Sequence, residues 1–67
     1  MIKLTVNGRP TELEMPQPLL EYLAALGVNP QAVAVEINGQ LLQRSDYSAG
    51  RLNEGDVVEI VRMVGGG

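Results

Sequence analysis

Apolar and polar residues alternate near the start of the chain, which is the period-two pattern of half-buried β-strands. Ile2, Leu4 and Val6 are separated by polar residues, and the alternation resumes over residues 11–15 after an intervening Asn7-Gly8. Both residues of an Asn-Gly pair tolerate the positive φ angles of a type I′ turn, so this dipeptide is a strong hairpin signal. We therefore predict two antiparallel strands in this part of the chain.

The apolar spacing becomes helical after Pro16. Pro18 suits the first position of a helix, where its missing N–H is not needed. Leucines then recur at helical spacing: Leu19, Leu20, Leu23 and Leu26. Gly27 suits the left-handed residue that ends a helix, and Pro30 lies shortly beyond it. The pattern predicts one helix from about Pro18 to Leu26.

Alternation returns in the second half of the chain and predicts three more strands. Residues 33–37 alternate, Asn38-Gly39 forms a second turn, and residues 40–43 form a short fourth strand. We expect the polar segment 44–50 to be irregular with one short helical turn, and Val57–Val64 to be the last strand. This order predicts an α+β domain in which a mixed sheet of four to five strands packs on one α-helix.

The alternation also divides the side chains between a core that faces the helix and an uncovered face of the sheet. We expect the core to contain Leu4, Val6, Leu13, Leu19, Leu23, Leu26, Val35, Ile37, Val58 and Ile60. If Val58 and Ile60 face the helix, Val61 faces water. Val61, with Met63 and Ala34, then forms an exposed apolar patch, and such patches usually mark partner surfaces. Isolated surface valines are equally ordinary, so both interpretations stay open.

Composition excludes several classes of function. A chain of 67 residues forms one domain. It contains no cysteine and no histidine, which removes thiol chemistry, the usual neutral-pH proton shuttle and the commonest metal ligand. The net charge is −3 and the basic residues are dispersed, which argues against nucleic acid and anionic membranes as partners. We recognise neither a membrane span nor a signal peptide, and therefore expect a soluble, cytoplasmic protein without a cofactor.

Side chains with catalytic potential are nearly absent from the sequence. Ser45 and Ser48 have no histidine or nearby lysine that could serve as a base. Glu12 and Glu14 share one face of a predicted strand, but two carboxylates alone make a poor metal site. A solvated strand face is the better interpretation of this pair. We expect no catalytic residue and no metal site.

Three glycines, Gly65-Gly66-Gly67, directly follow the apolar last strand. Glycine has no side chain to pack and the greatest backbone freedom, so we expect residues 1–64 to form the domain and residues 65–67 a flexible tail. The α-carboxylate of Gly67 becomes an acylating agent only after activation, for example by adenylation in another enzyme's pocket. Gly65 and Gly66 would allow the tail to enter a narrow channel. An ordinary frayed terminus is the alternative.

A known family shares residues distributed over nearly the whole chain. They lie in Ile2–Gly8, the leucine-rich helix ending at Gly27, Val33–Gly39, Arg44–Tyr47, Gly55–Ile60 and Val64–Gly67. On these segments the chain resembles the ThiS family, the sulfur carrier proteins of thiamine biosynthesis, which have a ubiquitin-like β-grasp fold. Gly66-Gly67 at this chain length is the discriminating mark, whereas the family accepts other small residues at the position of Gly65.

The resemblance implies a protein substrate and carrier rather than an enzyme. An ATP-dependent adenylating enzyme would convert Gly67 to a glycyl adenylate, and sulfur from a donor system would replace AMP to leave a terminal thiocarboxylate. Thiazole synthase would then accept the sulfur for the thiazole ring of thiamine. Sulfur carriers for molybdopterin or for tRNA thiolation share the fold and the Gly-Gly end. A ubiquitin-like binding or modifier module without sulfur chemistry is a further alternative.

Overall fold

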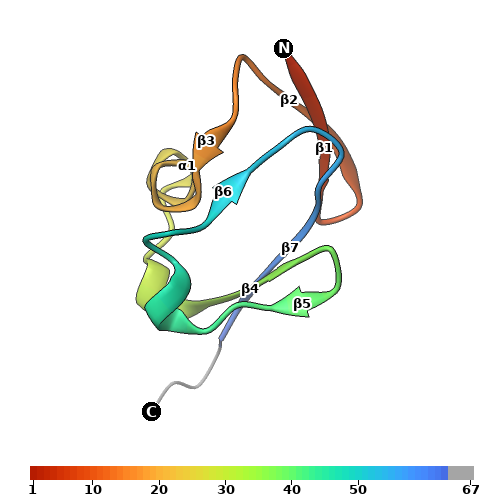
Figure 1. The fold of residues 1–67 in the computed structure, drawn as a ribbon. Helices are drawn as coiled ribbons and strands as arrows, with labels where there is room; N and C mark the ends of the chain where they lie inside the picture. The colour runs from red at the N-terminus through yellow and green to blue at the C-terminus, as the bar shows by residue number, and fades with distance from the viewer. Residues whose placement is uncertain (64–67) are drawn as a thin grey trace.

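The structure, a computed structural model that describes residues 1–63, is a mixed β-sheet with one helix on one of its faces (Figure 1). The main sheet has five strands in the order β2-β1-β7-β4-β5. Their bounds are Ile2–Val6 for β1, Arg9–Leu13 for β2, Val33–Ile37 for β4, Gln40–Leu41 for β5 and Val57–Arg62 for β7. The helix α1 spans Leu19–Leu26. The predicted combination of one helix and a mixed sheet is confirmed.

Short elements complete the connections between the main strands. A separate two-stranded sheet pairs β3 (Gln17–Pro18) with β6 (Arg51–Leu52), and two 3₁₀ turns are η1 (Pro30–Ala32) and η2 (Arg44–Asp46). The last strand, β7, ends at Arg62, two residues before the end predicted for it. Val64 and the predicted flexible tail, residues 65–67, lie outside the described residues.

Both predicted Asn-Gly turns are present, and each connects two antiparallel strands. β1 pairs with β2, and β4 pairs with β5. Asn7 and Asn38 adopt positive φ angles of 50° and 53°, and the glycine after each has a φ angle of 78° or 83°. Asparagine and glycine are the residues that tolerate this left-handed region most readily. The local sequence therefore determines both hairpins.

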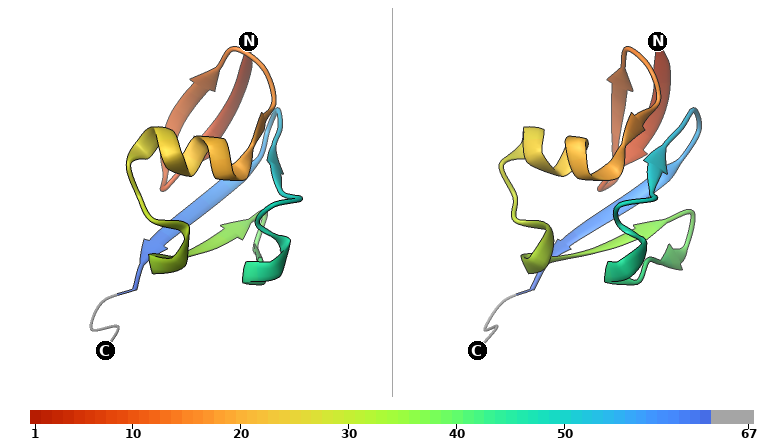
Figure 2. Two further views of the ribbon diagram at one scale, coloured as in Figure 1. Left: turned by 90° about the vertical axis from the view of Figure 1, so that its left-hand side faces the viewer. Right: turned by 60° about the vertical axis from the view of Figure 1, so that its left-hand side comes forward.

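β7 lies in the middle of the sheet although it is the last strand along the chain. It runs parallel to β1, with Val58 beside Val6, and antiparallel to β4, with Val58 opposite Ile37. Parallel neighbours require a long crossover connection, and here α1, η1 and the second hairpin all lie between β1 and β7. Figure 2 shows α1 lying across the face of this sheet.

The helix α1 ends where the sequence predicts. Gly27 adopts a left-handed φ of 77°. Its N–H donates a hydrogen bond of 3.0 Å to the oxygen of Ala24, and the N–H of Val28 donates one of 3.2 Å to the oxygen of Leu23. These bonds satisfy carbonyl groups that have no partner within the helix. The helix starts at Leu19 rather than Pro18, because Pro18 belongs to β3.

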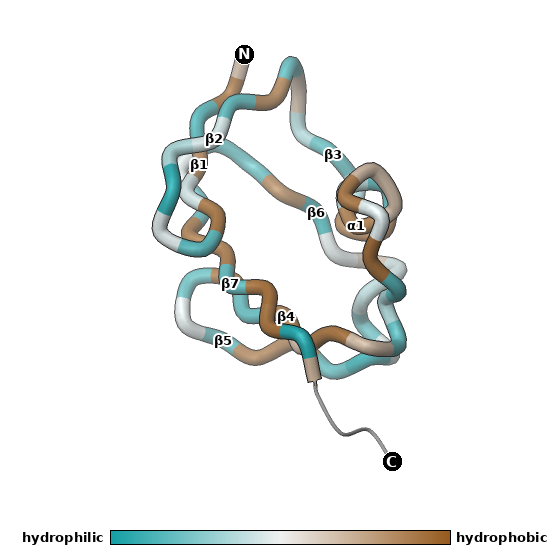
Figure 3. The backbone as a smooth tube through the Cα atoms, turned by 180° about the vertical axis from the view of Figure 1, so that it is seen from behind, coloured by the Kyte–Doolittle hydropathy of each residue, from teal (hydrophilic) through white to brown (hydrophobic). Residues whose placement is uncertain are grey.

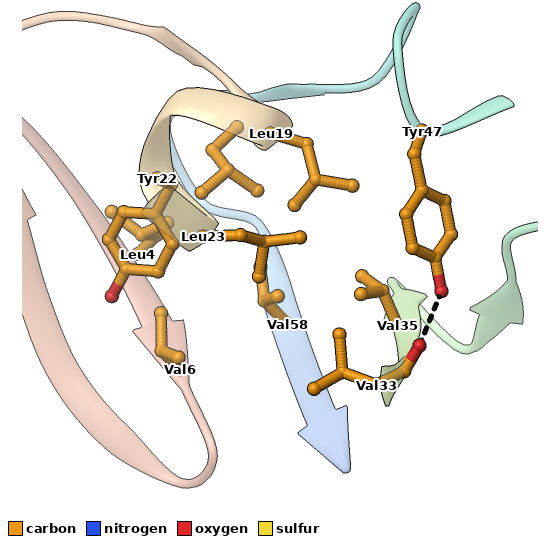
Figure 4. Packing of buried hydrophobic residues seen from close by; sticks show 10 residues of the cluster. Leu4, Val6, Leu19, Tyr22, Leu23, Val33, Val35, Tyr47 and Val58 are labelled. Atoms are coloured by element: carbon orange, nitrogen blue, oxygen red, sulfur yellow. Dashed lines mark hydrogen bonds between the residues drawn. The ribbon is translucent and has the colours of Figure 1, made fainter. Parts of the chain in front are cut away.

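The interior lies between α1 and the facing side of the sheet (Figure 4). The predicted core residues that are buried are Leu4, Val6, Leu19, Leu23, Val35 and Val58. Those that are half-buried and pack against this cluster are Leu13, Ile37 and Ile60. Buried side chains that the pattern does not predict are Tyr22, Val33, Tyr47 and Leu52. The predicted inner face of the sheet is confirmed, and the core extends further, to β6 and to the residue that follows η2.

Leu26 is a predicted core residue that the structure contradicts, since 49% of its surface is exposed. It lies in the last turn of the helix and, with Asn7, Arg9 and Thr11, lines a depression at the surface. The helix there has reached the turn of the first hairpin, whose polar residues leave the leucine half open to water. The predicted face of α1 is correct at its start and wrong at its end.

Tyr47 closes the interior on the side of β4. The segment 44–50 contains the short helical turn that the sequence predicts, but the ring of Tyr47 is buried. Its hydroxyl group donates a hydrogen bond of 2.9 Å to the main-chain oxygen of Val33, the first residue of β4 (Figure 4). A buried hydroxyl group needs such a partner. This contact ties an otherwise polar segment to the sheet.

We predict that Leu23→Ala lowers the free energy of unfolding by about 2–5 kcal/mol, the usual range for truncation of a buried leucine. Leu26→Ala is a matched control in the same helix. Its expected loss is below about 1 kcal/mol, because half of that side chain already meets water. Urea unfolding followed by circular dichroism gives both values. Equal losses for the two variants would contradict the buried face assigned to α1.

Candidate functional site

The face of the sheet opposite α1 carries the apolar residues predicted as a partner surface. In the antiparallel register of β4 and β7, Ala34 lies directly opposite Val61. Their strand neighbours, such as Val33 and Val35, are buried beneath α1, so these two residues point to the other face. Val61 is 57% exposed and Ala34 is half-buried. The structure therefore brings this predicted pair together.

Met63 extends the same apolar surface toward the end of the chain. Its N–H donates a hydrogen bond of 2.9 Å to the oxygen of Ala32, which continues the ladder between β7 and β4 by one step. Two positions after Val61, it shares the face of that residue and is 50% exposed. We call Ala34, Val61 and Met63 the outer patch. Seen from behind in Figure 3, apolar positions of β7 run beside β4 to the place where the chain leaves the sheet.

Two carboxylates lie beside the outer patch, and the sequence pattern does not reveal their proximity. Glu36 of β4 is directly opposite Glu59 of β7, and both are exposed on the same face as Val61. Leu41 of β5, which is also exposed, lies opposite Glu36 on its other side. Like charges directly opposite each other destabilise a sheet. The outer face thus combines exposed apolar side chains with an unfavourable pair of negative charges.

The two turn asparagines hold β7 through their side chains. Asn7 Oδ1 accepts a hydrogen bond of 2.7 Å from the N–H of Ile60, and its Nδ2 donates one of 3.3 Å to the oxygen of Ile60. Asn38 Oδ1 accepts a bond of 2.9 Å from the N–H of Val57, and its Nδ2 donates one of 3.0 Å to Asp56 Oδ1. The sequence identifies both asparagines as turn residues, but their bonds to β7 depend on tertiary structure.

The remaining candidates for chemistry fall into two pairs, the serines and the glutamates, which line separate depressions at the surface. Ser45, Ser48, Glu12 and Glu14 are exposed, and the two glutamates line a depression between β2 and the start of α1. Across residues 1–63, no three or more Asp, Glu, His or Cys side chains are grouped so that they could hold a metal ion. Nor is any helix in that range long and apolar enough to cross a membrane. Gly65, Gly66 and Gly67 lie outside the described residues.

The chain is similar in sequence both to small proteins of about its own length and to one segment of much longer enzymes. A sequence model of the ThiS family matches residues 4–67. The sulfur carrier protein ThiS of Thermus thermophilus is 37% identical over 62 residues, which cover 92% of this chain and 95% of that protein. The thiazole synthase of Paramagnetospirillum magneticum is 36% identical over 66 residues. These residues are 98% of this chain but only 20% of that enzyme.

Structural comparison agrees with the sequence. The crystal structure of the thiamine biosynthesis protein ThiS from Geobacter metallireducens superimposes with a TM-score of 0.83 at 38% identity, covering 98% of this chain and all of that chain. The mixed sheet, the single crossing helix and this match define a small protein of the ubiquitin-like β-grasp class. Within that class, the chain belongs to the ThiS family. The resemblance seen in the sequence is confirmed.

We predict that Val61→Asp leaves the fold intact, with a loss of stability of at most about 1 kcal/mol, since the new carboxylate remains in water. Val58→Asp is the contrasting variant in the same strand. It buries a carboxylate without a partner, so the domain is expected to unfold. Dispersion of the amide NMR spectrum distinguishes the two outcomes. Unfolding of Val61→Asp would contradict the placement of Val61 on the outer face.

Proposed function

We propose that the protein carries sulfur as a thiocarboxylate on the α-carboxyl group of Gly67. The match to the ThiS family through residue 67 carries this proposal, supported by near full-length similarity to a protein named as a sulfur carrier. Gly65 and Gly66 have no side chains, which suits passage of the terminus through a narrow channel of a partner. The described domain supplies a stable body and an exposed surface next to the last residues of the chain.

The proposed chemistry proceeds in two steps on the terminal carboxylate. The carboxylate first attacks the α-phosphorus of ATP, which releases pyrophosphate and leaves an acyl-adenylate. A sulfur nucleophile at the oxidation level of sulfide, from a donor system, then attacks the acyl carbon, and AMP leaves. One carboxylate oxygen has been replaced by sulfur. Partner enzymes supply the catalytic groups for both steps, so the chain acts as a protein substrate rather than as an enzyme.

Thiazole synthase is the proposed acceptor of the sulfur. A curated thiazole synthase contains a segment similar to nearly all of this chain within a much longer protein. Such a fusion keeps carrier and acceptor at a high effective concentration, which supports a working association between them. The ThiS family match favours thiamine over the alternatives of molybdopterin and tRNA thiolation.

The outer patch is the surface through which we propose that the carrier docks on the adenylating enzyme. It is apolar and exposed, and Met63 directly precedes the last four residues of the chain. A partner that covers the patch is therefore also close to the reactive end. Glu36 and Glu59 lie on the same face. Basic side chains of the partner around its apolar contact would complement them.

We expect the intact mass to rise by the difference between sulfur and oxygen when the protein is incubated with the adenylating enzyme, ATP and a sulfide donor. Deletion of Gly67 and the substitution Gly66→Val should both abolish this change, because the first leaves the terminal carboxylate one residue short of the reacting position and the second widens the tail. Gly65→Ala is the matched control and should still accept sulfur. Intact-protein mass spectrometry reads all four samples. A gain of sulfur by the chain that lacks Gly67 would refute the proposal.

We expect Val61→Asp to raise the Kd for the adenylating enzyme by about tenfold or more, because a charge at the centre of an apolar contact loses its hydration. Met15→Asp is the matched control, since Met15 is 65% exposed and lies in the loop between β2 and β3, away from the outer patch. Isothermal titration calorimetry gives both constants. Unchanged binding of Val61→Asp would exclude the outer patch from the interface.

A further inference from the structure

The end of β7 is held differently at its two edges. On the side of β4, main-chain pairing continues through Ala34 and Val61 to the bond between Met63 and Ala32. On the side of β1, the last bond between main chains runs from the N–H of Asn7 to the oxygen of Val58, at 2.8 Å. β1 ends at Val6 and the chain then turns into the hairpin. Beyond Val58, the main chain of β1 therefore supplies no further partner for the polar groups on this edge of β7.

The side chain of Asn7 takes the place of the missing strand residues. In a parallel ladder, the residue that donates to the oxygen of Val58 also accepts from the N–H two positions further along, which is that of Ile60. Asn7 supplies this acceptor as Oδ1, at 2.7 Å, and the next donor of the ladder as Nδ2, at 3.3 Å from the oxygen of Ile60. A side-chain amide has the same polar groups as a peptide, so it extends the ladder after the main chain has turned away.

We propose that Asn7 is a positioning residue for the reactive end of the carrier. Its amide fixes the β1 edge of β7 at Ile60, two residues before β7 ends at Arg62, and thereby sets the direction of β7 at its last residues. This inference rests on the proposed function, because the residue acts by presenting the terminus to the adenylating enzyme. A carrier whose last strand is already ordered as far as Arg62 loses less conformational entropy when it binds.

Asn38 provides an internal control for this proposal. It occupies the same position of the other Asn-Gly turn, with nearly the same positive φ, and its side chain also bonds to β7. Its bond to the strand is at Val57, the first residue of β7, at the opposite end of the strand from Arg62. Glycine accepts positive φ without strain, so Asn7→Gly and Asn38→Gly each remove one side-chain clamp while keeping the turn.

The test compares the two glycine variants as substrates of the adenylating enzyme, with release of pyrophosphate as the readout. Asn7→Gly is expected to raise KM about tenfold, which corresponds to about 1.4 kcal/mol, with kcat within about twofold of the wild-type value. Asn38→Gly is expected to leave KM unchanged, although both variants shift the urea midpoint by similar amounts. In the free protein, NMR order parameters at Ile60 and Arg62 should fall in Asn7→Gly alone. Equal KM values for the variants, or a raised KM without loss of order at these amides, would overturn the inference.

Failure of the proposed function gives a different result, because the wild-type protein itself would then release no pyrophosphate. That result would overturn both the proposed function and this inference.

If Asn7→Gly does not fold, Asn7→Asp gives the same test. Aspartate keeps the acceptor for the N–H of Ile60 and tolerates positive φ, but it loses the Nδ2 donor. A smaller rise in KM, of about threefold, is then expected. An unchanged KM in folded Asn7→Asp would overturn the inference.

Discussion

The placement of β7 between β1 and β4 is the constraint on which the rest of the structure depends. Val58 is fully buried because β1 contributes Val6 on one side, β4 contributes Ile37 on the other, and α1 covers all three. These contacts join the last strand to β1, α1 and β4, so none of them is local. The two hairpins share one core only when β7 lies between them. The same placement makes the middle strand of the sheet, which ends at Arg62, the one that precedes the last residues of the chain.

A single strand therefore stabilises the domain with one face and, in the proposed function, contacts a partner with the other. Val58 and Ile60 face α1, whereas Glu59 and Val61 face water, as the alternation of side chains along a strand requires. The inner residues determine whether the domain folds. The outer residues are free to vary in chemistry, and here they include opposed carboxylates that a purely stability-driven sequence would avoid. Local conflicts of this kind are commonest where a protein surface has a function.

The same domain occurs in relatives both as a small separate protein and as one segment of a longer enzyme. Both contexts are consistent with a body whose stability lies in its own core. In the proposed function, β7 connects that core to the reactive end, with the outer patch on one side of the exit and the side chain of Asn7 fixing the other edge. In that function, the folded domain binds the partner enzyme and positions the end of the chain, and the terminal carboxylate is the group that reacts.

The sequence by itself determined the features that depend on neighbouring residues. Both Asn-Gly hairpins, the end of α1 at Gly27 and the separation of Val58 from Val61 follow from turn chemistry and from the period of the apolar positions. The family could also be recognised, because its marks lie at fixed places along the chain. These signals are local, so they can be read without knowing how the strands pair.

Only the tertiary structure determined which residues distant in the sequence contact one another. The burial of Tyr47 depends on a carbonyl group of β4, and the exposure of Leu26 depends on where the sheet beneath the helix reaches a turn. The opposition of Glu36 to Glu59 and the bonds from Asn7 to Ile60 depend on strand register. Register joins residues that are distant in sequence, and a shift of one position would exchange the two faces of a strand. The alternation of apolar and polar residues shows which residues share a face of a strand. The elements packed around that strand determine whether each face contacts the core, another side chain or water.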